Sequence, residues 1–210
     1  MSRAFLKQWA VFSAPLLLAL ATVWMALPSE SATALFFEEH RTAHPGLTLC
    51  LKWLSALSNP AFYVYYGALL LRGLRQGDRA GVRAILILLA VQAVIALVAV
   101  HFVKRLVGRP RPGQSGLFDP LTNHPAYHSL PSGHTAEITG WALPRVLWSG
   151  RFWSGLLLGL LIAGVGVSRV YLGWHYPSDV FFGWLLGSLS GFATVSLVDS
   201  TLFRGRGDGG

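Results

Sequence analysis

Apolar residues gather along this chain in six long runs that are separated by short polar segments. A run of about 20 mostly apolar residues is long enough to cross a bilayer as a helix. The runs extend over 11–27, 47–71, 84–103, 135–148, 152–167 and 180–198. The pattern therefore predicts an all-α fold, a polytopic membrane protein with six transmembrane helices.

Two of the six runs depart from a continuous apolar stretch. The run 47–71 contains Lys52 and the sequence Ser58-Asn59-Pro60, and the run 135–148 is short and includes Pro144. The segment 28–45 between the first two runs is charged, and it also carries aromatic side chains. We expect this segment to lie along the membrane surface.

Composition agrees with a membrane protein and argues against a soluble one. Hydrophobic residues make up 53% of the 210 residues and charged residues only 12%, about half the charged fraction of a typical soluble domain. The mean hydropathy is +0.50. The net charge of +8 does not indicate a nucleic-acid partner, because the basic residues fall between the apolar runs. The single cysteine, Cys50, excludes an intrachain disulfide.

The distribution of Lys and Arg predicts the orientation of the chain, because cytoplasmic loops are enriched in both. With the N-terminus inside, the inner basic residues are Arg3, Lys7, Arg72, Arg75, Arg79, Arg83, Arg145, Arg151, Arg204 and Arg206. The outer ones are Arg41, Lys52, Lys104, Arg105, Arg109, Arg111 and Arg169. Most of the outer residues lie beside the candidate site described below, so both termini are expected inside.

The chain is expected to form one membrane domain over residues 1–203, followed by a disordered tail over 204–210 that is rich in Gly and Arg. The first apolar run could instead be a cleaved signal peptide, since small residues follow it at 31–34. Its length favours a retained helix.

Three polar clusters stand beside the ends of apolar runs. In the first, Lys104 closes the third run, and Arg111 follows in the proline-rich sequence Arg109-Pro110-Arg111-Pro112. Lys104 alone could simply reach the lipid headgroups. The prolines stiffen the loop, however, and a fixed Arg can hold two phosphate oxygens while Lys supplies a point charge.

The second cluster, Pro131-Ser132-Gly133-His134, precedes the fourth run. It could be an ordinary turn with Ser132 near a helix N-cap. A helix N-terminus also binds anions through its free N–H groups, and Gly133 allows the backbone to approach a ligand closely. His134 is then placed to donate a proton to a leaving oxygen.

The third cluster joins Ser168-Arg169 at the end of the fifth run to His175 and Asp179 before the sixth. Pro177 disfavours helix at the preceding residue, so His175 is expected in the turn. A carboxylate beside one imidazole nitrogen leaves the other free to attack. Asp179 could instead be only a helix-terminal charge. The histidines lack further ligands at the spacing of a zinc site.

The three clusters together resemble the type 2 phosphatidic acid phosphatase superfamily. Its pattern is a Lys with Arg-Pro seven residues later, then Pro-Ser-Gly-His, then Ser-Arg with a following His and Asp, and every position is met here. The resemblance covers about 84–198 and implies a metal-independent lipid phosphatase without a cofactor. The charge distribution described above places this site on the outer face of the membrane, which we expect to be the periplasmic face of a bacterial cytoplasmic membrane.

The resemblance also implies residue roles. His175 attacks phosphorus and forms a phosphohistidine, Asp179 orients it, and His134 protonates the leaving oxygen. The phosphoryl oxygens are held by Lys104, Arg111, Arg169, Ser132 and Gly133.

The expected partners are the bilayer and a membrane lipid phosphate, such as undecaprenyl diphosphate, phosphatidylglycerophosphate, phosphatidic acid or a lipid A phosphate. No nucleic acid and no obligate protein partner are expected. Three alternatives stay open: a lipid-to-lipid phosphotransferase, a relative of the vanadate-dependent haloperoxidases, and a membrane protein without catalytic activity.

Overall fold

The computed structural model describes residues 3–114 and 116–207, and these contain helices and loops but no strand. The α-helices are α1 (Arg3–Ala26), α2 (Glu30–Ala43), α3 (Pro45–Gln76), α4 (Arg79–Gln92), α5 (Val100–Val107), α6 (Gly133–Ser149), α7 (Phe152–Tyr171) and α8 (Pro177–Gly207). A π-helical segment, η1 (Ala93–Ala99), joins α4 to α5, and a 3-10 turn, η2 (Pro125–Tyr127), lies before α6. The predicted all-α class is confirmed.

Four helical stretches among the described residues are long and apolar enough to cross a membrane: Arg3–Ala26, Arg79–Val107, Phe152–Tyr171 and Pro177–Thr201. The other two predicted runs are helical, as part of α3 and α6, but they do not meet the same criterion. α6 has only 17 residues, fewer than the roughly 20 that span a bilayer. The predicted segment 28–45 contains α2, which carries the charges Glu30 and Arg41.

Local sequence accounts for where several of these helices begin and end. Pro45 occupies the first turn of α3, where its missing N–H has no helical partner to lose. Gly77 ends α3 in the left-handed conformation, with φ of 69°, which glycine adopts without strain. Asp78 then caps α4 by accepting the N–H of Gly81 at 2.9 Å. α3 and α4 are thus joined by a tight turn.

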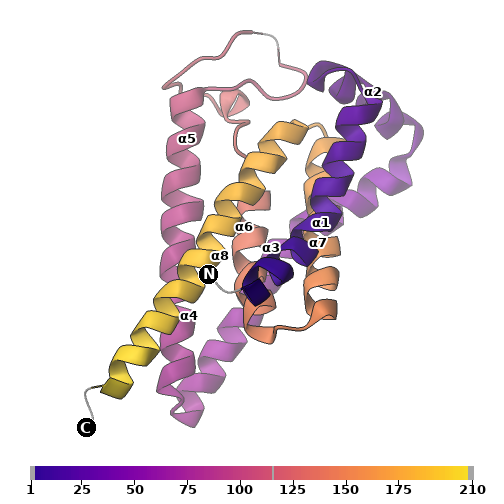
Figure 1. Cartoon of the computed structure of the whole chain (residues 1–210). Helices are drawn as coiled ribbons and strands as arrows, with labels where there is room; N and C mark the ends of the chain where they lie inside the picture. Colours follow the sequence, from indigo (N-terminus) through magenta and orange to yellow (C-terminus); the bar gives the residue numbers. More distant parts are fainter. Residues whose placement is uncertain (1–2, 115, 208–210) are drawn as a thin grey trace.

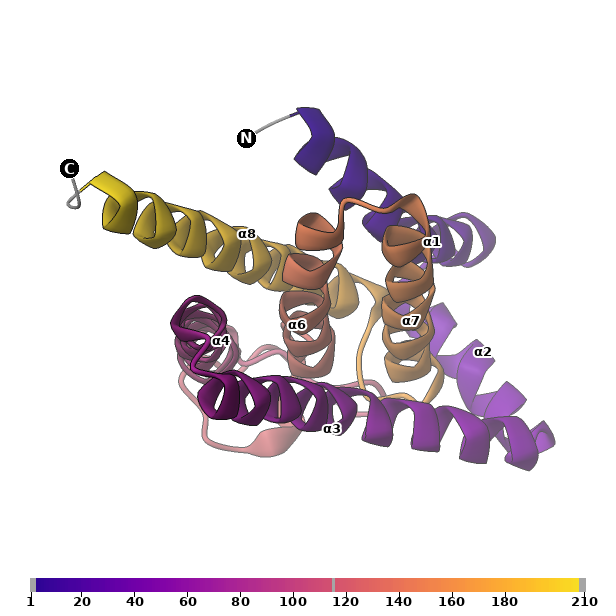
Figure 2. The ribbon, with the colours of Figure 1, turned by 90° about the horizontal axis from the view of Figure 1, so that it is seen from below.

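α6 lies at the centre of the bundle and contacts α1, α3, α4, α7 and α8, as the view from below shows (Figure 2). α8 approaches α6 closely because glycines recur every four residues on the face that meets it. A Cβ on Gly183 or Gly187 would lie 2.5 Å from the carbonyl oxygen of Ser132 or 2.4 Å from that of Ala136. Small residues at this spacing let helix backbones meet in a membrane. The contact holds the starts of α6 and α8 together.

The two ends of the bundle differ in what they carry. The α5–α6 loop, α2, and the turn from α7 to α8 lie at one end, and the α3–α4 and α6–α7 turns lie at the other (Figure 1). Gln8 of α1 donates to the carbonyl of Gly150 at 2.7 Å, so the start of α1 lies beside the α6–α7 turn. The predicted tail 204–210 overlaps the end of α8, which continues to Gly207, and its last three residues lie outside the described part.

Candidate active site

The structure brings the three sequence clusters together at the end of the bundle that carries the α5–α6 loop (Figure 1). Lys104 lies in the last turn of α5, and Arg169 in the last turn of α7. His134 lies in the first turn of α6 and Asp179 in that of α8. His175 lies in the turn between α7 and α8, as predicted. Residues distant in sequence therefore meet because they occupy helix ends.

A cavity of about 320 Å³ lies between these helix ends. Its size suits a phosphorylated headgroup, since small-molecule sites begin at about 300 Å³. The predicted site residues that line it are Lys104, Arg111, Gly133, His134, Arg169 and His175. A second hollow of about 280 Å³ shares Arg111, His134 and Arg169 and is bounded by Trp174. A larger one, of about 490 Å³, lies between α3, α6 and α7 and contains none of the predicted residues.

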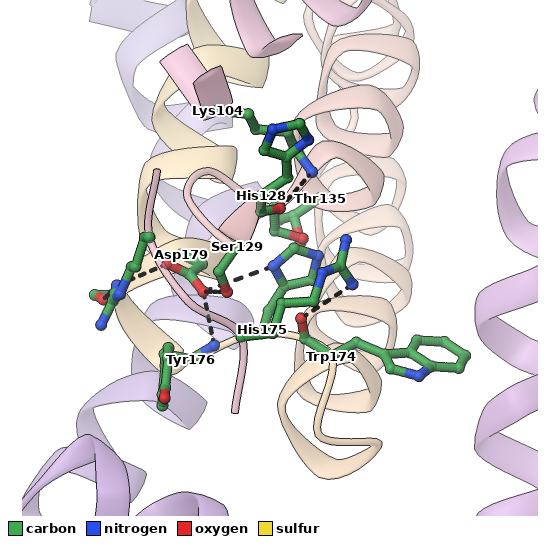
Figure 3. Close-up of polar contacts among 12 residues, drawn as sticks. Lys104, His128, Ser129, Thr135, Trp174, His175, Tyr176 and Asp179 are labelled. Carbon is green, nitrogen blue, oxygen red and sulfur yellow. Dashed lines mark hydrogen bonds and ion pairs between the residues drawn. The ribbon is translucent and has the colours of Figure 1, made fainter. Parts of the chain in front are cut away.

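His175, which lines the cavity, forms a buried pair with Asp179 (Figure 3). The Nδ1 atom of His175 is 3.6 Å from Oδ2 of Asp179, slightly too long for a hydrogen bond. Catalytic contacts are often long without substrate and tighten once it binds. Burial lowers the pKa of His175 to about 3, while Asp179 opposes this shift and Arg169 adds to it. His175 is therefore an uncharged imidazole at neutral pH, the form that can act as a nucleophile.

Asp179 is held by residues that converge on both of its carboxylate oxygens (Figure 3). The Ser129 hydroxyl donates to Oδ2 at 2.6 Å, and the Tyr176 N–H donates to the same oxygen at 2.8 Å. Arg109 donates to Oδ1 at 2.7 Å. Asp179 is completely buried, and a buried carboxylate is stable only when it is paired in this way. The arrangement fixes the carboxylate that faces His175.

Arg109 and Glu30 extend this network to α2, and the sequence did not reveal either of them. Arg109 pairs with Glu30 and donates to the Ser178 hydroxyl at 2.6 Å. Glu30 also accepts the N–H of Ser178 at 3.0 Å. The Arg109 guanidinium lies 4.5 Å from the centre of the Tyr176 ring. Arg109 therefore joins α2, the α5–α6 loop and the start of α8 around Asp179.

The three cavity cations are oriented by neutral groups. Lys104 donates to the carbonyl of His128 at 3.1 Å, and Arg111 to that of Trp174 at 3.4 Å. Arg169 donates to the Ser55 hydroxyl at 3.0 Å and lies 4.1 Å from the Trp174 ring. None of the ion pairs in the described part of the chain includes these three cations. Their charge therefore stays available to an anion in the cavity.

His134 stands among these cations. Burial, together with the positive charges of Arg169, Lys104 and Arg111, lowers its pKa to about 4. Burial also lowers the pKa of Arg111. A bound phosphate would offset the cations and stabilise protonated His134, because an adjacent opposite charge favours the charged form. Substrate binding can therefore supply the general acid.

Ser132 and Gly133 take different positions at the start of α6. Gly133 lines the cavity. Ser132 is the N-cap and is completely buried. Its N–H donates to the carbonyl of Asp179 at 2.8 Å, and its hydroxyl accepts from Thr135 at 3.0 Å. These contacts link α6 to α8, and the phosphate-binding role of Ser132 stays a prediction.

Within the described residues, no group of three or more His, Cys, Asp or Glu side chains is arranged to hold a metal ion. Besides the predicted site residues, the cavity is lined by Glu137, His101 and the apolar Ala96 and Val100. The donor set is thus dominated by nitrogen cations, which suits an oxyanion ligand.

Comparison with known proteins gives several relatives and no solved structure that matches. An undecaprenyl-diphosphatase of Sulfolobus acidocaldarius is 36% identical over 121 residues, which cover 55% of this chain and 56% of the relative. A putative undecaprenyl-diphosphatase of Escherichia coli is 34% identical over 107 residues, covering 51% and 54%. A lipid A 1-phosphatase of Rhizobium johnstonii is 32% identical over 93 residues, covering 42% and 37%. The chain spans about half the length of the first two relatives.

The PAP2 superfamily profile matches residues 81–201. This range begins in α4 and extends into α8, so it contains all three clusters and the helix ends that position them. With more than half of the sequence covered, the chain belongs to the PAP2 superfamily.

Proposed function

We propose that this protein is an integral membrane lipid phosphatase that hydrolyses a phosphomonoester or diphosphate headgroup through a phosphohistidine. The observation that carries the proposal is the cavity, where the neutral imidazole of His175 lies among Lys104, Arg111 and Arg169. Phosphoryl transfer depends mainly on positioning and on stabilising the charge of the transferred group. Three oriented cations and a buried nucleophile supply both.

In the first half of the proposed reaction, Nε2 of His175 attacks phosphorus while Nδ1 faces Asp179. The P–O bond to the lipid breaks, and His134 gives its proton to the departing oxygen. In the second half, neutral His134 takes a proton from water, the water oxygen attacks phosphorus, and the P–N bond to Nε2 of His175 breaks. The products are inorganic phosphate and the lipid alcohol, or the lipid monophosphate when the substrate is a diphosphate. Both histidines return to their starting states.

Lys104, Arg111 and Arg169 hold the equatorial oxygens throughout, together with the start of α6 at Ser132 and Gly133. These fixed cations offset the phosphoryl charge, a task that magnesium performs in many other phosphoryl-transfer sites. The proposed mechanism therefore needs no metal ion.

The proposed membrane arrangement keeps six spans, with α3 and α6 crossing beside the four longer stretches. Large apolar side chains are exposed on several helices, among them Leu18, Val64, Val98 and Leu157. A soluble protein rarely exposes so many, and lipid would cover them. The inner end of the bundle carries the α3–α4 and α6–α7 turns with their arginines, and the site lies on the outer, periplasmic face of a cytoplasmic membrane.

The test is a phosphate-release panel on the purified protein in detergent micelles. The substrates are a polyprenyl diphosphate, phosphatidylglycerophosphate, phosphatidic acid and a lipid A phosphate. The proposal predicts release from at least one of them and none from a His175→Ala variant that elutes as wild type does on size exclusion. Failure of the wild type on every lipid, or equal turnover by His175→Ala, contradicts the proposal.

A further inference from the structure

One carboxylate that lines the cavity has no role in the proposed chemistry. Glu137 lies on α6, three residues after His134, and both side chains border the cavity. It accepts a hydrogen bond from the Asn59 amide at 2.7 Å and another from the Tyr63 hydroxyl, both on α3. No ion pair in the described part of the chain includes Glu137. Neutral donors therefore fix the carboxylate without cancelling its charge.

Two helices place Glu137 deeper in the bundle than the cations. On α6, Glu137 follows His134 by three positions, a rise of about 4.5 Å along the helix axis at 1.5 Å per residue. On α3, Ser55 holds Arg169, whereas Asn59, one turn further from the outer end, holds Glu137. Both helices run from the outer end inward (Figure 1). Glu137 therefore lies on the side of the cavity that faces the middle of the bilayer.

The backbone at this position is also fixed. The amide of Gln92 in α4 donates to the Glu137 carbonyl at 2.9 Å, and Ser190 of α8 donates to Gln92 at 2.6 Å. His101 of α5 completes this side of the cavity and offers a further hydrogen-bonding group. The carboxylate thus has a defined place between α3, α4 and α6.

A lipid phosphate bound by the cations must extend inward past this position, because its tail stays in the bilayer. The group next to the scissile oxygen then lies beside His134 and Glu137. A carboxylate accepts hydrogen bonds from hydroxyl groups. It repels a second phosphate at the same place, since like charges a few ångströms apart are unfavourable.

We propose that Glu137 is a specificity-determining residue, which selects lipid phosphomonoesters with a hydroxyl beside the scissile bond and disfavours lipid diphosphates. This inference rests on the proposed function and names the substrate class for the same cavity. The proposed preference for monophosphates would distinguish this chain from the relatives that are named as undecaprenyl-diphosphatases.

The experiment compares Glu137→Gln with wild type on two matched pairs of substrates. A polyprenyl monophosphate and the diphosphate of the same chain isolate the second phosphate. Lysophosphatidic acid and phosphatidic acid with the same acyl chain isolate the hydroxyl. Glu137→Gln should raise the diphosphate-to-monophosphate ratio of kcat/KM about tenfold or more, because it removes the repulsion. It should also reduce the preference for lysophosphatidic acid, because an amide is a weaker acceptor.

Three variants separate this role from a structural one. Tyr63→Phe removes a donor and keeps the charge, so the diphosphate-to-monophosphate ratio should stay within about threefold of wild type. Glu137→Asp also keeps the charge, so it should keep the preference for the monophosphate. Glu38→Gln removes a carboxylate on the exposed face of α2 and is the control, which should leave the ratio unchanged.

If Glu137 merely joins α3 to α6, Glu137→Gln and Tyr63→Phe would lower kcat/KM for the diphosphate and the monophosphate in proportion. An unchanged diphosphate-to-monophosphate ratio in Glu137→Gln would therefore overturn the inference. A wild type that releases phosphate from no lipid refutes the proposed function instead.

Discussion

Replacing Arg109 with Gln tests whether the network around Asp179 serves catalysis. Arg109 donates to Oδ1 of Asp179 at 2.7 Å, and the carboxylate is completely buried. The variant leaves that oxygen without its charged donor, while Ser129 and the Tyr176 N–H still hold Oδ2. Asp179 should then rotate more freely and orient His175 less well. Arg109 acts through Asp179 and is a positioning residue.

The expected size follows from the lost hydrogen bond. A hydrogen bond to a charged group contributes about 1.5–3 kcal/mol. If this loss falls on the orientation of His175 in the transition state, kcat/KM drops about 10- to 150-fold, at about 1.4 kcal/mol per tenfold change. The effect should appear mainly in kcat, because Arg109 does not line the cavity that binds the phosphoryl group. The melting temperature should also fall, since a buried charge loses its partner.

The assay is phosphate release at several substrate concentrations, corrected for the folded fraction by size exclusion. Arg105→Gln is the matched control, because Arg105 is an exposed cation of the same segment. Glu30→Gln should cause a smaller loss than Arg109→Gln, since the Arg109–Asp179 contact remains. A folded Arg109→Gln protein with the kcat of wild type, or a defect confined to KM, would refute the reasoning.

Three further predictions concern the charges, the metal and the topology of the site. The inhibition constant of sulfate, which stays a dianion, should fall from about pH 8 to about pH 5 as the bound anion raises the pKa of His134 from its low value. His134→Gln should flatten this profile, and a constant that is independent of pH in wild type would contradict the assignment. Activity should survive excess EDTA, and vanadate should compete with substrate as a transition-state analogue; activity lost in EDTA and restored by magnesium would refute the metal-free mechanism. After Cys50 is replaced, an impermeant maleimide should label a cysteine at Asn123 in intact cells but not one at Gln76, and the reverse pattern would invert the orientation.

The convergence of the three clusters could be predicted because each cluster abuts a helix end. Helices that cross the same layer bring their ends to one of two faces, so the order of the runs along the chain already groups Lys104, His134 and Asp179. The turn position of His175 followed from Pro177, which disfavours helix at the residue before it. These are local signals, and the structure bears them out.

The support around Asp179 could not be predicted in the same way. Arg109 and Arg111 both precede a proline, and the family pattern that the chain resembles selects Arg111 for the phosphate but says nothing about Arg109. Glu30 precedes Asp179 by almost 150 residues, so only the tertiary packing of α2 brings them into one network. The burial of Asp179, which calls for a nearby cation, is itself seen only in the structure.

The membrane spans show a different limit. α3 carries polar residues that hold the site, including Ser55 and Asn59, and they lower its apolar character. α6 is short and packed on several sides. If both helices cross the membrane, as the proposed six-span arrangement requires, these features explain why hydropathy identifies them less well than α1 or α7.

The central claim is that His175 carries the phosphoryl group, and a rapid-quench experiment tests it most directly. The purified protein is mixed with a lipid phosphate labelled at the terminal phosphorus, quenched in alkali and digested for mass spectrometry. The account predicts an alkali-stable, acid-labile phosphohistidine at His175 that forms and decays at rates consistent with turnover, and none in His175→Ala. Turnover without a phosphoenzyme, or label on another residue while His175→Ala still releases phosphate, would contradict the account.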